Sequence, residues 1–114
     1  MRNTRPITWL KAALKDFEDF PAEAQLEVRR ALTVAAEGGK SDKAKPFKGV
    51  GSGVFEIALR HRGDAFRAIY AVQIDADLWV IHAFQKKSKT GTKTPQVVID
   101  LIRERLKRLK EALR

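Results

Sequence analysis

The chain has no cysteine among its 114 residues, which excludes disulfide bonds and thiolate chemistry. Its two histidines and scattered acidic residues form no recognisable ligand set, so we expect no metal site and no cofactor. No apolar run approaches the roughly 18 residues of a membrane span. The first residues also lack the apolar stretch of a secretory signal. These absences predict one soluble domain over residues 1–114, located in the cytoplasm and without a membrane partner.

Acidic side chains are in deficit as well, with 14 against 23 basic ones and a formal net charge of +9. The excess is segregated along the chain. Residues 1–39 carry six basic and six acidic side chains, whereas residues 40–114 carry seventeen and eight. Such a division favours a polyanionic partner on one side of the molecule over a charge that serves solubility alone.

Residues 54–84 have the alternating pattern of β-strands. Phe55, Ile57 and Leu59 fall on one face of such a strand, and Glu56 falls on the other. Turn-forming residues follow at 62–64 and again at 75–77, so the stretch divides into three strands. Connections this short predict an antiparallel meander.

Helical spacing of apolar residues occupies most of the remaining chain. It predicts one helix from Leu10 to about Phe20 and a second from Pro21 to the glycines at 38–39. A last helix is expected to begin at Thr94-Pro95, and Ile7–Trp9 is expected to form either a short strand or a docking segment. Residues 40–53 are predicted to form a basic loop. The fold class is therefore α+β, with an N-terminal helical hairpin packed on a small antiparallel sheet and a C-terminal helix.

The strands carry the side chains that metal-free phosphate chemistry requires. Cleavage of RNA through its own 2′-hydroxyl needs a base, cations that hold the phosphate, and an acid at the leaving oxygen. Glu56 or His82 are the candidates for proton transfer, and Arg60 and Arg67 for phosphate contacts. Two simpler interpretations remain open, in which His82 is a core histidine and Glu56 only pairs with an arginine.

Four segments together resemble the RelE/ParE toxin superfamily, and within it the HigB-like, phage-derived group. They are residues 53–56, residues 63–70, the run His-Ala-Phe-Gln-Lys-Lys-Ser at 82–88, and Thr94-Pro95. The resemblance covers about residues 9–109. It implies the toxin of a type II toxin–antitoxin pair, which in RelE-like and HigB-like members cuts mRNA in the ribosomal decoding site. The implied partners are the ribosome, mRNA and a helix-turn-helix antitoxin.

The resemblance carries over to single residues only in part. Arg67 stands where RelE-like enzymes keep an arginine that binds the reacting phosphate, and Lys87 stands near a second cationic position. The two lysines that RelE has on its preceding strand fall at Glu56 and Ala58 here. Glu56 is typical of the HigB-like group. The C-terminal catalytic Tyr or His of some relatives has no counterpart in the last helix.

We therefore expect a metal-independent endoribonuclease that inhibits translation. The alternatives are a ParE-like poison of DNA gyrase and a phage-derived nucleic-acid-binding protein without activity. By strand alternation, Arg67 is expected to be either exposed or paired with Glu56 across the sheet. The expected catalytic residues are Arg67, Lys87, Glu56 and His82, and the expected phosphate contacts are Arg60, Lys86, Lys89 and Lys48.

Overall fold

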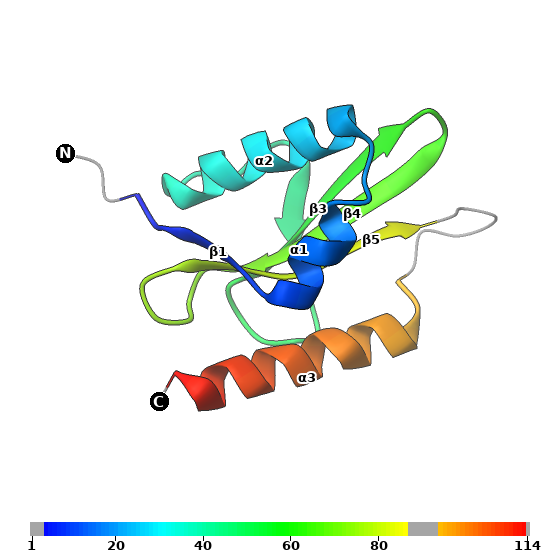
Figure 1. The fold of residues 1–114 in the computed structure, drawn as a ribbon. Coiled ribbons are helices and arrows are strands. Elements are labelled where there is room, and N and C mark those ends of the chain that lie inside the picture. Colours follow the sequence, from blue (N-terminus) through cyan, green and yellow to red (C-terminus); the bar gives the residue numbers. More distant parts are fainter. Residues whose placement is uncertain (1–3, 87–93, 114) are drawn as a thin grey trace.

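Helices cover both faces of a central sheet in the computed structural model, which describes residues 4–86 and 94–113 (Figure 1). Within these residues the sheet has five strands in the order β1-β5-β4-β3-β2. The elements in chain order are β1 (Ile7–Trp9), α1 (Lys11–Phe17), α2 (Ala22–Ala36), β2 (Ala44–Pro46), β3 (Val54–His61), β4 (Asp64–Ala71), β5 (Leu78–Lys86) and α3 (Gln96–Ala112). Strands β3, β4 and β5 form the antiparallel meander, so the expected α+β class is confirmed.

The turn between β3 and β4 is the tightest reversal in the meander. His61 pairs with Asp64, so only Arg62 and Gly63 form the loop. Both have positive φ, 51° at Arg62 and 85° at Gly63. Two-residue hairpins favour such turns because their twist matches that of the strands, and asparagine or glycine tolerates this backbone best.

Arg62→Asn is accordingly expected to stabilise the protein. A non-glycine residue with left-handed backbone angles lowers the stability of the fold by roughly 1 kcal/mol. Asparagine recovers part of this stability by local hydrogen bonding. We expect chemical denaturation to show a gain of about 0.5 kcal/mol. Gly63→Ala is the matched control, and it should lower stability by about 1 kcal/mol. A variant Arg62→Asn that is less stable than the wild type would contradict this account of the turn.

One face of the sheet is covered by α1 and α2. Phe17, Phe20 and Val28 from this helical layer pack on Ile57 and Tyr70 of the sheet. The rings of Phe17 and Phe20 lie 5.5 Å apart, which continues the apolar layer from α1 towards α2. This is the helical hairpin expected from the sequence.

Helix α3 lies against the opposite face, below the sheet in Figure 1. Its buried residues Ile102, Leu106 and Leu109 pack with Ile69 and Ile81. None of the helices in the described part of the chain has the length and apolar character needed to cross a bilayer.

Three details differ from the sequence-based expectation. The basic loop predicted at residues 40–53 contains the edge strand β2, which pairs with β3. Strand β2 has no apolar alternation and includes a proline, and an edge strand tolerates both because one side makes no ladder bonds. Helix α1 ends at Phe17, before a short turn, rather than near Phe20. The short strand β1 is present as expected, but it pairs with β5 in parallel.

Candidate active site

A buried ion pair joins β3 and β4 on the face covered by α3. Glu56 lies opposite Ile69, and Arg67 lies opposite Ala58, so the two are diagonal neighbours on one face. Nη1 of Arg67 donates a hydrogen bond of 3.0 Å to Oε2 of Glu56. The side chains are only 11% and 3% exposed. This arrangement confirms the expected alternative in which Arg67 pairs with Glu56.

Arg67 also has a donor that the pair does not use. Its Nε is buried and has no hydrogen-bond partner among the described residues. A buried donor without a partner is destabilising, and such donors are uncommon in native proteins. An anion that reached Arg67 would satisfy this donor. The ion pair therefore presents a preformed contact for a phosphate oxygen.

A cleft of about 520 Å³ opens above the pair, between β2 and the beginning of α3. Lys45 reaches into it from β2, with its Nζ 4.0 Å from Oε1 of Glu56. The side chain of Lys45 is 68% exposed, so it is able to follow a ligand. The residues that line the cleft are Lys45, Pro46, Phe47, Lys48, Glu56, Arg67, Thr94, Gln96 and Ile99. The floor is thus a buried ion pair and the rim is basic.

Two contacts hold the walls of the cleft together. The backbone N–H of Phe47 donates to the carbonyl of Val54 at 2.8 Å, which fixes the segment after β2 to the sheet. Arg103 of α3 donates from Nε and Nη2 to the carbonyl of Gly49, at 3.1 and 2.8 Å. A two-pronged contact of this kind fixes direction as well as distance. These hydrogen bonds therefore fix the position of helix α3 relative to the segment after β2.

The other expected phosphate contacts lie around Arg67. Arg60 lines a neighbouring hollow of about 310 Å³ to which Arg67 also contributes. The pKa of Lys86 is lowered, first by desolvation and then by the charge of Arg67, while Glu56 opposes the change. Lys86 is thus within electrostatic reach of the ion pair. The expected sites Lys87 and Lys89 lie outside the described residues, and their roles stay predictions.

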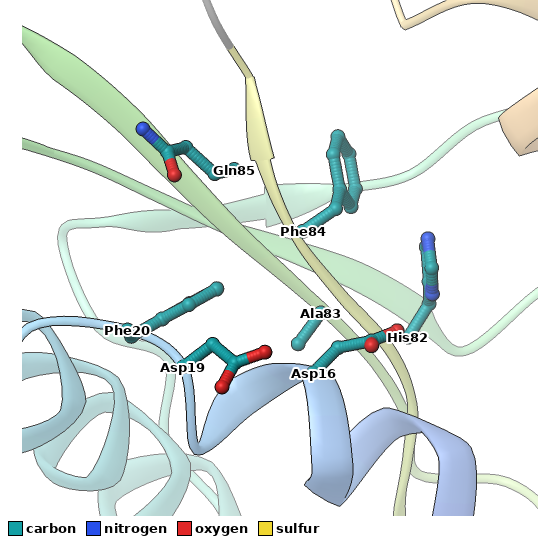
Figure 2. Close-up of a pocket in the computed structure, with 7 residues that line it drawn as sticks. All are labelled: Asp16, Asp19, Phe20, His82, Ala83, Phe84 and Gln85. Atoms are coloured by element: carbon teal, nitrogen blue, oxygen red, sulfur yellow. The ribbon is translucent and has the colours of Figure 1, made fainter.

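His82 is on the same sheet row as Glu56, with Ile69 between them, but it lines another cavity. This cavity has a volume of about 300 Å³ and opens beside α1, where the carboxylates of Asp16 and Asp19 face β5 (Figure 2). Nη1 of Arg105 lies 3.0 Å from Nδ1 of His82. Because arginine only donates, Nδ1 accepts and the proton of the neutral ring is on Nε2.

The pKa of His82 is lowered to about 4, first by burial and then by the charge of Arg105, while Asp16 opposes both. The ring is therefore neutral at physiological pH. His82 is a buried histidine with a partner, as the simpler interpretation of the sequence proposed. Its separate role in proton transfer stays a prediction.

The lowered pKa of His82 predicts a dependence of stability on pH. Below about pH 6.5 the unfolded chain binds a proton at His82, whereas the folded chain keeps this ring neutral to about pH 4. Unfolding is then favoured increasingly as the pH falls through this window, by about 2 to 3 kcal/mol at most. The measurement is chemical denaturation of the wild type and of His82→Gln between pH 7 and pH 4. Stability curves that run parallel for the two proteins would contradict it.

Several residues of the cleft were not expected from the sequence. Lys45 and Phe47 fall in the stretch that the sequence predicts to be a loop, because strand β2 has one buried residue, Ala44, and no apolar alternation. Thr94 and Gln96 mark the expected helix start, but their place against β2 depends on how α3 crosses the sheet. In the described residues no group of three or more histidine, aspartate or glutamate side chains is arranged to hold a metal ion.

Two solved structures share this fold. An arginine double mutant of the Escherichia coli toxin RelE in the free state superposes with a TM-score of 0.64 and 16% identity, over 92% of this chain and 97% of that chain. A chain of the toxin–antitoxin complex RelBE2 from Mycobacterium tuberculosis superposes with a TM-score of 0.52 and 14% identity, over 75% and 94%. The chain thus has the fold of RelE.

The sequence itself places the chain in a family. Residues 15–107 match the family described as "Phage derived protein Gp49-like (DUF891)". The chain belongs to this Gp49-like family, as the resemblance to the phage-derived group indicated. No curated protein matches it in sequence.

Proposed function

We propose that the protein is the toxin of a RelE-type toxin–antitoxin pair and that it cuts mRNA in the decoding site of the ribosome. One observation carries the proposal: the buried Glu56–Arg67 pair forms the floor of an open cleft with a basic rim. A site of this kind offers a carboxylate and fixed cations at the same place, as cleavage through the 2′-hydroxyl requires. The RelE fold and the Gp49-like family support it.

In this mechanism Arg67 binds the scissile phosphate and Glu56 is the base. The phosphate draws the guanidinium away from Glu56, whose carboxylate then accepts the proton of the 2′-hydroxyl. The 2′-oxygen attacks phosphorus, and the bond from phosphorus to the 5′-oxygen breaks. A lysine ammonium, either that of Lys45 at the rim or that of Lys86 within electrostatic reach of the ion pair, gives its proton to the leaving oxygen. The lowered pKa of Lys86 makes its ammonium a stronger acid than an ordinary lysine side chain.

We also propose that an antitoxin of the helix-turn-helix class is the partner that keeps the protein inactive. The M. tuberculosis structure with this fold is a toxin–antitoxin complex, which supports an antitoxin as partner here. The ribosome would supply the second partner surface. Ribosomal RNA is a polyanion, and the described face around the cleft carries Lys45, Lys48 and Arg60 as exposed cations.

The experiment is a translation reaction to which the purified protein is added, with primer extension on the mRNA. A supercoiling assay with DNA gyrase runs in parallel. The proposal predicts new mRNA 5′-ends only when ribosomes are present, and unchanged supercoiling. Inhibited supercoiling with intact mRNA would contradict the proposal and favour the gyrase alternative. Intact mRNA with unchanged supercoiling would favour a nucleic-acid-binding protein without activity.

A further inference from the structure

The cleft has an apolar wall beside its cations. Phe47 is the aromatic side chain among the described residues that line it, and Pro46 and Ile99 flank the same space. Lys48 directly follows Phe47 in the chain, and Lys45 lies two residues before it. A cleft that accommodated only a phosphate group would need no apolar side. This one combines an aromatic ring with cations in about 520 Å³, which is ample for one nucleotide.

The position of Phe47 is fixed before any ligand arrives. Its backbone N–H donates a hydrogen bond of 2.8 Å to the carbonyl of Val54, and its ring is half-buried against the core under α3. The contact of Arg103 with Gly49 restrains the segment that follows. Only part of the ring is therefore used by the core, and the remainder faces the cleft. A restrained aromatic ring of this kind is the form that proteins use to stack an unpaired base.

We propose that Phe47 is the base-stacking platform of a one-nucleotide subsite, in which a base lies on the ring while its phosphate contacts Arg67. The substrate class, single-stranded RNA, rests on the proposed function. Gln96 and Thr94 at the start of α3 are the polar groups placed to meet the edge of that base. In this subsite Arg67 contacts the phosphate, which is the same in every nucleotide, and the start of α3 contacts the base, which differs between nucleotides.

The test compares two small ligands that differ only in the base. Adenosine 5′-monophosphate and ribose 5-phosphate are titrated into the wild-type protein, and binding is followed by NMR. Stacking predicts that the nucleotide binds more tightly than the sugar phosphate by roughly fivefold or more. Phe47→Leu should abolish this difference and leave the affinity for ribose 5-phosphate unchanged. Phe47→Tyr should retain the difference.

Phe55→Leu is the matched control, because Phe55 is a half-buried phenylalanine on the other face of the sheet, stacked on Tyr70 at 5.4 Å. It should retain the wild-type difference. Equal or undetectable binding of both ligands by the wild type, or a full difference in Phe47→Leu, would overturn the inference. A subsite that shows the difference in a protein that leaves mRNA intact on ribosomes would instead overturn the proposed function. The two failures are therefore distinct.

Discussion

Arg67→Ala is expected to lower the free energy of unfolding by about 3 to 5 kcal/mol, because it removes the hydrogen-bonded cation of the buried Glu56 carboxylate and leaves only the exposed Lys45, 4.0 Å away. Glu56 is 2% exposed, so water that enters through the cleft replaces the lost partner only incompletely. Chemical denaturation of the purified variant measures the effect. The matched control is Arg108→Ala. Arg108 also makes a 3.0 Å bond to a glutamate, Glu104, but the two side chains are 77% and 51% exposed.

The control should change stability by less than about 0.5 kcal/mol, since exposed helix pairs contribute little. The double variant Glu56→Leu with Arg67→Met tests the cause. It removes both charges and should recover most of the stability that Arg67→Ala loses. A single variant as stable as the wild type would show that the pair is not buried in solution. A double variant no more stable than Arg67→Ala would show that the loss does not come from an unpaired charge.

The second large effect is on activity. Arg67→Lys retains a positive charge beside Glu56, so the fold should persist, but an ammonium cannot make the two-pronged contact of a guanidinium. Loss of one preorganised contact to a transition state lowers rates by roughly 10²- to 10³-fold. We therefore expect that induction of Arg67→Lys no longer arrests growth within the time in which the wild type does.

A melting curve of the same variant must accompany the growth assay, because a protein that fails to fold would also be harmless. Arg30→Lys is the control for the exchange itself. Arg30 is exposed on α2, which covers the other face of the sheet, and its variant should inhibit growth as the wild type does. A folded Arg67→Lys variant of full toxicity would remove Arg67 from the mechanism.

The sequence predicts the meander and the helices because their signals are local. Alternation places Phe55, Ile57 and Leu59 on one face, and the turn at Arg62-Gly63 requires only neighbouring residues. Strand β2 has no such signal, since Ala44 is its sole buried residue. It forms because β3 offers an open edge, which is a tertiary cause. The parallel pairing of β1 with β5 likewise depends on segments some 70 residues apart.

The residues of the candidate site also fall into a part that the sequence predicts and a part that it does not. Glu56 and Arg67 were predictable, because two strands joined by a two-residue turn must bring their alternating side chains onto one face. The wall of the cleft was not predictable, because Phe47 and Gln96 line the same space only through the placement of α3 beside the segment after β2. The protonation state of His82 was also not predictable from the sequence. It depends on Arg105, which comes from a helix 23 residues further along the chain.

The most direct test of the central claim, that mRNA is cut in the Glu56–Arg67 cleft, is the single-turnover rate of mRNA cleavage on programmed ribosomes. The wild type, Arg67→Lys and Arg30→Lys are compared with ribosomes in excess. We predict unchanged cleavage by Arg30→Lys and a rate lower by roughly 10²-fold or more for folded Arg67→Lys. Equal rates for all three proteins would contradict the claim and place the chemistry elsewhere on the molecule.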